Sequence, residues 1–330
     1  MGELFGRYEI IEEIGRGAMG TVHRAHDTVL DRAVAIKRMR SGPRVDPELT
    51  KRFYREAQVG ARLQHSSIVT VYDLGEHEGT SFIVMELLDG IDWRKVIIER
   101  RAMPAAKRIE LMAQVCDGLA HAHRHTIVHR DLKPSNLFIH QDHQAKILDF
   151  GLARMPTSSL TLTGRVLGTP NYMAPEQILG QRVDSRSDLF SAAIVFFEFL
   201  TGIHPFRGPI VPRQIVDGEP ERLVNINPLL PDSLGLIFER ALAKSPDARY
   251  QDAAELASDL RAAVREVPEE PGAQVPLSPE SSSLSPESQT QVSAPDAPLY
   301  AADADTETIV YLAPETRPVP PGPNEGSSHK

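Results

Sequence analysis

Two carboxylates, a carboxamide and an ammonium group lie within one short stretch of the chain, residues 129–151. The stretch reads HRDLKPSNLFIHQDHQAKILDFG, and the four groups belong to Asp131, Lys133, Asn136 and Asp149. Carboxylate and amide oxygens are hard ligands that suit Mg²⁺, which usually keeps phosphate oxygens and waters as its other ligands. The residue types in this stretch therefore predict a site for the phosphates of a nucleotide.

Two apolar runs, residues 137–139 and 145–148, must position these groups. The polar segment 140–144 between them predicts a hairpin connection between two strands. In an antiparallel hairpin, the residue that enters the first strand lies beside the residue that leaves the second. We therefore expect Asn136 and Asp149 to meet at one end of the hairpin.

The pattern His-Arg-Asp-x-Lys-x-x-Asn, followed by Asp-Phe-Gly, resembles the catalytic and metal-binding segments of the protein kinases, and the resemblance covers about residues 8–262. It implies that Asp131 orients and deprotonates the substrate hydroxyl and that Lys133 contacts the transferred phosphate. Asn136 and Asp149 would hold the metal ions. The implied cofactors are ATP and Mg²⁺, with Mn²⁺ as an alternative metal.

A glycine-rich turn precedes these motifs, and its glycines are Gly15, Gly17 and Gly20. Glycines let backbone amides approach phosphate oxygens without a side-chain clash. The spacing GxGxxG alone is also found in dinucleotide-binding folds, where a helix follows the glycines. Here the following residues, Thr21 to Ala25, are typical of a strand, which favours the flap that covers ATP in kinases.

Lys37 stands among apolar strand residues, so its ammonium group needs an anion or a route to solvent. Asp46 and Pro47 predict the start of a helix, and Glu56 falls on its inward stripe. A pair between Lys37 and Glu56 would satisfy both charges and resembles the Lys–Glu pair of active kinases. The alternative is that Glu56 is a surface acid beside Arg55.

The residues from Ser81 to Leu88 are typical of a buried strand that runs out of the first lobe. The resemblance implies that Met85 lies at the back of the adenine pocket and that Glu86 to Leu88 pair their backbone with adenine. The apolar residues implied around the base are Ile14, Val22, Ala35 and Phe138. Each of these could also be an ordinary core residue.

Residues 152–173 are polar and rich in hydroxyl groups, and Ala-Pro-Glu follows them, as in a kinase activation segment. Thr161 and Thr163 are candidate autophosphorylation sites that resemble the paired threonines of bacterial Pkn-type kinases. Arg130 would receive such a phosphate through charge-assisted bonds. Thr169 is expected to support the catalytic loop.

The resemblance also implies two structural anchors. Asp188 would bind the backbone of the catalytic loop, and Glu176 would pair with Arg249, since a buried acid without a partner is costly. Pro209 and Pro212 make their segment a poor helix candidate, which puts the family's substrate-docking helix in doubt.

Lys133 and the Gly-Thr-Pro sequence at residues 168–170 resemble Ser/Thr kinases rather than Tyr kinases. The implied function is transfer of the γ-phosphate of ATP to protein Ser/Thr hydroxyls in bacterial signalling, with a homodimer as a means of trans-autophosphorylation. One alternative is a pseudokinase, a scaffold that binds nucleotide or a partner without transfer. A small-molecule kinase is the other, and the Ala-Pro-Glu segment argues against it.

The chain of 330 residues is long enough for two lobes and a sizeable core. The resemblance to protein kinases implies an α+β fold, with a small antiparallel sheet lobe that carries the C-helix at about residues 8–86 and a larger, mainly helical lobe at about 89–265. Its single cysteine, Cys116, excludes an internal disulfide and fits a reducing compartment. It falls in an apolar helical pattern, which predicts a buried residue. His121 and His125 are four apart in the same helix, but no third metal ligand is evident.

The net charge of −9 lies in the tail, residues 266–330, which has 11 acidic residues, 2 basic residues and 12 prolines. This composition predicts a disordered segment. The rest of the chain is electrically balanced, so we expect no nucleic-acid partner. No apolar stretch reaches the roughly 20 residues that a bilayer requires, so we expect no membrane span and a cytoplasmic location.

Overall fold

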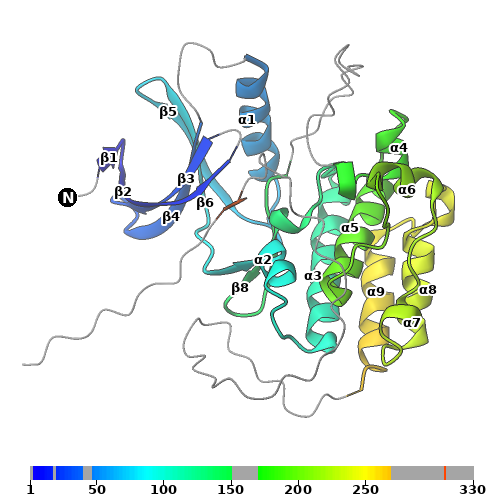
Figure 1. The fold of residues 1–330 in the computed structure, drawn as a ribbon. Coiled ribbons are helices and arrows are strands. Elements are labelled where there is room, and N and C mark those ends of the chain that lie inside the picture. The colour runs from blue at the N-terminus through cyan, green and yellow to red at the C-terminus, as the bar shows by residue number, and fades with distance from the viewer. Residues whose placement is uncertain (1–2, 18–19, 40–46, 151–169, 269–307, 310–330) are drawn as a thin grey trace, which may run out of the picture.

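The structure is a computed structural model that describes residues 3–17, 20–39, 47–150, 170–268 and 308–309, without the side chains of residues 47–49, 52, 56 and 308–309. Figure 1 shows two lobes, a curved sheet with one helix beside it and a larger body made mainly of helices. The expected α+β arrangement of two lobes is confirmed. The candidate site lies where the lobes meet.

The first lobe is an antiparallel sheet with the strand order β1-β2-β3-β4-β6-β5. Its strands are β1 (Glu3–Phe5), β2 (Tyr8–Arg16), β3 (Gly20–Asp27), β4 (Arg32–Met39), β5 (Val71–His77) and β6 (Thr80–Met85). Helix α1 (Pro47–Gly60) lies beside the sheet and contacts β5. The sheet places the glycine turn, between β2 and β3, next to the end of β4, where Gly20 pairs with Met39.

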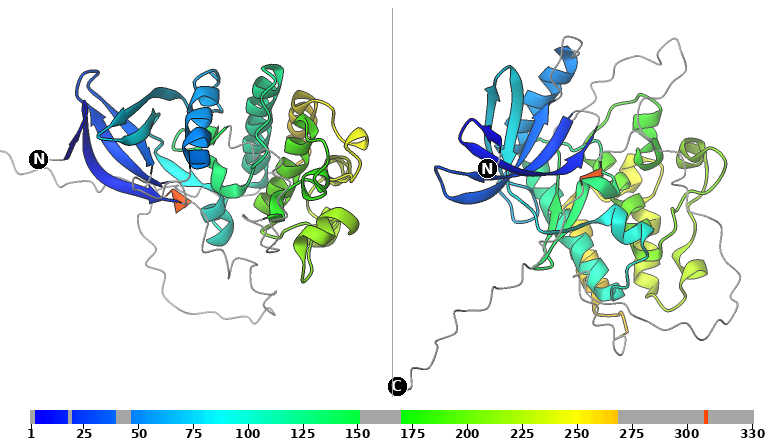
Figure 2. Two further views of the ribbon diagram at one scale, coloured as in Figure 1. Left: turned by 90° about the horizontal axis from the view of Figure 1, so that it is seen from above. Right: turned by 60° about the vertical axis from the view of Figure 1, so that its left-hand side comes forward.

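Two strands differ from the sequence expectation. β1 pairs with Tyr8–Ile10 of β2, so the sheet begins before the expected boundary at residue 8. β10 (Thr308–Ile309), from the tail, pairs with Gly15 and Arg16 of β2, and Figure 2 shows it alongside the end of that strand. The prediction of disorder is therefore wrong for these two residues of the tail.

The second lobe begins with a three-stranded sheet made of β7 (Gly90–Asp92), β8 (Leu137–His140) and β9 (Ala145–Ile147). Gly90 has φ 152°, and a Cβ on it would lie 2.0 Å from the carbonyl oxygen of Ile139. Only glycine allows β7 to approach β8 this closely. The predicted hairpin of residues 137–148 is present as β8 and β9.

Helices form the rest of this lobe. They are α2 (Trp93–Ile98), α3 (Ala105–Arg124), α4 (Pro175–Ile178), α5 (Ser185–Thr201), α6 (Val211–Asp217), α7 (Leu223–Ile226), α8 (Asp232–Ala241) and α9 (Ala253–Val264), with short 3₁₀ turns at Pro134–Asn136, Pro170–Tyr172 and Pro246–Ala248. None of the helices that the structure describes is both long and apolar enough to cross a bilayer.

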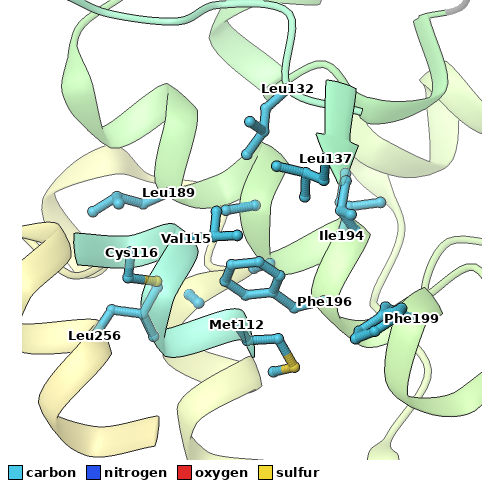
Figure 3. Close-up of a cluster of buried hydrophobic side chains, with 14 of the residues drawn as sticks. Met112, Val115, Cys116, Leu132, Leu137, Leu189, Ile194, Phe196, Phe199 and Leu256 are labelled. Carbon is cyan, nitrogen blue, oxygen red and sulfur yellow. The ribbon is translucent and has the colours of Figure 1, made fainter. Parts of the chain in front are cut away.

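The core of this lobe is built around α5, which is buried on almost every side. Figure 3 shows Ile194 and Phe196 of α5 against Met112 and Val115 of α3. Asp184 caps the start of α5 by accepting the N–H of Arg186 at 2.9 Å. A helix apolar all round can only be stable inside a core, so α5 is a fixed support for whatever binds to its ends.

Cys116 of α3 belongs to the same core and is fully buried, as its apolar helical pattern predicted. Burial raises the pKa of its thiol far above the ordinary value. A buried neutral thiol is a poor nucleophile, so Cys116 is a packing residue.

The expectation of a poor helix around Pro209 and Pro212 is wrong for the residues from Val211 onward. α6 forms from Val211, with Pro212 in its first turn. A proline is tolerated there because the N–H groups of the first turn have no partner within the helix.

Candidate active site

The candidate metal ligands lie at the open end of the β8–β9 hairpin, opposite its turn. Leu137 faces Ile147 in register, and beyond that pair the N–H of Leu148 donates to the carbonyl of Asn136 at 2.9 Å. Asp149 follows directly. Asn136 and Asp149 are therefore adjacent across the hairpin mouth, as the strand register requires.

Asp131 and Lys133 lie in the loop before the hairpin, and their side chains are 3.0 Å apart. The side-chain amide nitrogen of Asn136 donates to the carbonyl of Asp131 at 2.8 Å. This bond fixes the orientation of the carboxamide and leaves its oxygen, Oδ1, for another partner. The side chain of Asp131 is 40% exposed, so its carboxylate is accessible from outside the site.

Lys37 of β4 reaches across from the first lobe to Asp149. Its Nζ lies 3.2 Å from Oδ1 of Asp149, and the two side chains are only 5% and 6% exposed. Two buried opposite charges in contact stabilise each other and would be costly apart. The backbone of Glu56 lies in α1, but its side chain is outside the described residues, so the expected pair with Lys37 is untested.

A carboxylate on α5 holds the backbone of the catalytic loop. Asp188 accepts the N–H of His129 and the N–H of Arg130, each at 2.8 Å, and its Oδ2 also lies 2.8 Å from Nε2 of His123. The ring of His129 in turn lies 3.0 Å from the carbonyl of Leu148. The loop is thus bonded to the buried helix on one side and to the hairpin on the other.

Two non-glycine residues beside the reactive groups have left-handed backbone angles. Arg130 has φ 65° and Asp149 has φ 54°. Such conformations cost of order 1 kcal/mol or more and persist only where the surroundings enforce them. The Nε of Arg130 is buried without an acceptor among the described residues, which suits a cation that binds an anion.

Glu176 of α4 forms the predicted pair with Arg249. The two carboxylate oxygens bind the guanidinium at 2.8 and 2.9 Å, and Ser187 donates to the first of them at 2.6 Å. Burial alone would raise the pKa of Glu176, but the bonds from Arg249 and Ser187 outweigh it and lower the pKa below its ordinary value. Next to it, Gln177 donates to the carbonyl of Arg130 at 2.9 Å.

The apolar residues expected around adenine gather in one buried cluster between the lobes. The expected members are Ile14, Val22, Ala35, Met85, Leu88 and Phe138, and the cluster also contains Met39, Phe53, Ala57, Val69, Ile83 and Leu148. Gly20 lies nearby, and a Cβ on it would fall 1.9 Å from the carbonyl oxygen of Arg38. Close packing against β4 therefore requires glycine at position 20, in addition to the role of this residue in the glycine-rich turn.

Thr161, Thr163 and Thr169 lie outside the described residues, and the expectations for them are untested.

The structure adds two features that motif reasoning missed. Lys146 of β9 lies 2.8 and 2.9 Å from the carboxylate oxygens of Glu86. His65 brings a third imidazole beside His121, at 5.2 Å between ring centroids, and His121 is 4.7 Å from His125. Among the described residues, no group of three or more His, Cys, Asp or Glu side chains is arranged to hold a metal ion.

Comparison with known proteins assigns the family. The model of the protein kinase domain matches residues 8–258. Serine/threonine-protein kinase PknB of Mycolicibacterium smegmatis is 41% identical over 271 residues, which cover 78% of this chain and 43% of that protein. Serine/threonine-protein kinase PrkC of Bacillus subtilis is 38% identical over 262 residues, which cover 78% of this chain and 40% of that protein.

Solved structures agree with this assignment. The PknI kinase domain of Mycobacterium tuberculosis has a TM-score of 0.63 at 29% identity, and the alignment covers 79% of this chain and 98% of that one. The chain spans less than half the length of the curated relatives that it matches. It belongs to the protein kinase family, among the Pkn-type serine/threonine kinases of bacteria.

Proposed function

We propose that this domain transfers the γ-phosphate of Mg-ATP to Ser and Thr hydroxyls of proteins, its own activation segment among them. One observation carries the proposal. Lys37 from the first lobe, Asp131 and Lys133 from the loop, and Asn136 and Asp149 from the hairpin mouth converge on a single site between the lobes. Charge stabilisation and positioning of this kind supply most of the catalysis in phosphoryl transfer.

Asp131 orients the attacking hydroxyl and accepts its proton. Its exposed carboxylate is accessible to a protein side chain, and the Lys133 ammonium beside it can contact the phosphate as negative charge builds up. The bonds from Asp188 to the loop backbone keep both side chains in place. Catalysis by positioning depends on this kind of support.

Asn136 and Asp149 fit a Mg²⁺ ion, because they offer an amide oxygen and a carboxylate, both hard ligands. The bond from Asn136 to the carbonyl of Asp131 supports this fit, since it turns the amide oxygen away from the loop. A bound ion would neutralise negative charge on the phosphates. Two protein ligands are few, so phosphate oxygens and waters complete the coordination.

Lys37 holds the α- and β-phosphates, and the backbone of Gly15, Gly17 and Gly20 covers them. The apolar cluster that contains Ile14, Val22, Ala35 and Phe138 forms the walls of the adenine site. Met85 lies behind the base, and the backbone from Glu86 to Leu88 binds its polar edge.

Arg130 receives a phosphate from Thr161 or Thr163, which orders the activation segment, while Thr169 supports the catalytic loop. Transfer between two copies of the chain would deliver that phosphate. The substrates are proteins, and the compartment that fits is the cytoplasm, where ATP and reduced thiols are available.

The test compares Lys37→Met and Asp131→Asn with the wild-type chain and with the control Lys107→Met. This control changes a half-buried lysine of α3 that contacts the turn of the hairpin, at the end opposite the candidate metal ligands. Incubation with radiolabelled ATP and a generic basic protein measures transfer, and mass spectrometry locates the modified threonines. Both site variants are expected to remain folded and to lose at least a hundredfold in rate. The control is expected to keep the wild-type rate.

Wild-type transfer by Asp131→Asn would overturn the assignment. A wild-type chain that binds ATP and transfers nothing would instead support the pseudokinase alternative, for which the described residues offer no support.

A further inference from the structure

Strand β9 belongs to the helical lobe, but each of its residues binds a different neighbour. The N–H of Ala145 donates to the side-chain oxygen of Gln114 on α3 at 2.7 Å. The N–H of Ile147 donates to the carbonyl of Ser67, in the loop before β5, at 2.9 Å. Between them, Lys146 reaches the residue that follows β6. β9 is therefore the strand through which the hairpin is joined to the first lobe.

The contact made by Lys146 is well defined. Its ammonium binds both carboxylate oxygens of Glu86, and Lys146 is only 9% exposed. One of these oxygens also accepts the N–H of Thr70 at 3.3 Å, while the N–H of Glu86 donates to the carbonyl of Thr70 at 2.9 Å. Exposed ion pairs are loosely held, but here the lysine is buried and the carboxylate is also held by the backbone of Thr70, which restricts both partners.

The two partners lie beside the two ends of the nucleotide site. Glu86 follows Met85 directly, at the start of the segment proposed to bind adenine. Lys146 precedes Asp149 by three residues. It also faces Phe138 in the strand register, and Phe138 belongs to the apolar cluster of the adenine site. The pair thus connects the adenine-binding segment to the strand that leads to the metal-binding carboxylate.

We infer that Lys146 and Glu86 are positioning residues that set the separation between the adenine-binding segment and Asp149. This inference rests on the proposed function, because it gives the pair a part in binding Mg-nucleotide. A nucleotide is anchored at both ends only when the spacing between the two anchors matches its length. Misplacement by about 1 Å is enough to cost a large factor in such sites.

A purely structural pair would behave differently. Its loss would lower the free energy of unfolding without changing how nucleotide affinity depends on Mg²⁺. The readout that separates the two roles is the ratio of the affinities for AMP-PNP with and without Mg²⁺, measured by titration calorimetry. Adenosine, which has no phosphates, reports on the adenine-binding segment alone.

The variants are Lys146→Met, the isosteric Glu86→Gln, and the charge swap Lys146→Glu with Glu86→Lys. Lys146→Met is expected to bind adenosine within about twofold of wild type. Its gain in AMP-PNP affinity from Mg²⁺ is expected to fall about tenfold, the usual effect of removing a residue that supports a metal ligand. The swap is expected to restore most of that gain.

Arg261→Met is the matched control, because it breaks an ion pair with Asp117 between α9 and α3, away from the cleft. It is expected to keep the wild-type gain from Mg²⁺. Should Lys146→Met unfold, Glu86→Gln gives the same comparison with a smaller change in shape.

The inference would be overturned if Lys146→Met kept the wild-type gain in AMP-PNP affinity from Mg²⁺, or if Arg261→Met lost as much of that gain. It would also be overturned if the charge swap restored none of the gain. No phosphoryl transfer is measured in this experiment, so its failure is distinct from failure of the proposed function, which is tested by the rates of Lys37→Met and Asp131→Asn.

Discussion

Two buried ion pairs of the molecule are built in opposite ways. Arg249 and Glu176 form two parallel contacts at 2.8 and 2.9 Å, with side chains 0% and 5% exposed. The same guanidinium donates to the carbonyls of Ala243 and Lys244, each at 2.7 Å. Lys37 and Asp149 are nearly as buried, and here an ammonium approaches one oxygen of the carboxylate, Oδ1, at 3.2 Å.

The difference follows from the groups used. A planar guanidinium matches both oxygens of a carboxylate and has one favourable geometry, whereas an ammonium is a point charge that can exchange one anion for another. The pair in the helical lobe is therefore suited to fixing the end of the activation segment. The pair in the cleft is suited to taking up phosphate and metal and releasing them again.

Of the substitutions that test this difference between the two pairs, Arg249→Met is expected to have the largest effect on stability. It leaves the buried Glu176 carboxylate with Ser187 as its remaining side-chain donor, and removal of one partner from a buried pair costs about 3–5 kcal/mol. Urea unfolding measures the loss. The control is Arg222→Met, which removes an exposed pair with Glu239 and should cost less than about 1 kcal/mol. Equal losses for the two variants would show that the buried pair is not a structural anchor.

Asp149→Asn tests the other pair. The carboxamide keeps the shape and still accepts a hydrogen bond from Lys37, and the flexible lysine stem lets the ammonium turn toward water or another anion. The loss in the free energy of unfolding should therefore be smaller than the roughly 3–5 kcal/mol expected for Arg249→Met. Phosphoryl transfer should fall at least about a hundredfold, because the metal loses a charged ligand. Asp142→Asn, in the exposed turn of the same hairpin, is the control and should keep the wild-type rate. A destabilisation as large as that of Arg249→Met would contradict the contrast between the pairs.

The smallest expected effect is the loss of free energy of unfolding at acidic pH. The pKa of Glu176 is lowered in the folded protein, so the folded state binds its proton less readily than the unfolded state. Stability from this group is present above the unfolded pKa and is lost as the pH falls through the folded pKa. Between about pH 5 and pH 3, the wild type should lose up to about 1.4 kcal/mol per pH unit more than Glu176→Gln, the slope for one proton. Parallel pH profiles for the two proteins would argue against a charged, bonded Glu176.

Residue patterns were enough to predict the hairpin and the two side chains that lie at its mouth, Asn136 and Asp149, whereas the two lobes were predicted through resemblance to the family. The reason is physical: the 137–148 hairpin is local, and strand register decides which residues meet at its mouth. The pair of Glu176 and Arg249 spans 73 residues, and no local pattern reveals such a contact. It was predicted through resemblance to the family.

The contacts that were missed are those between lobes. Glu86 looks like an ordinary charged residue after a strand, and Lys146 like one within a strand. No local pattern shows that the loop before β5 runs alongside β9, where Ile68 and Ile147 form a parallel bridge. His65 was overlooked for the same reason, since it comes from a loop distant in sequence from His121. Pro212 misled the helix prediction because its effect depends on whether it falls in the first turn or later.

The left-handed angle at Arg130 has a consequence for heat resistance. Glycine or asparagine adopts such an angle more readily than arginine, so the backbone at this position would relax if the residue were replaced. The same replacement would remove the cation proposed to bind a phosphate of the activation segment. At this residue, greater thermal tolerance and activation by phosphorylation are opposed, and selection for either property alone would compromise the other.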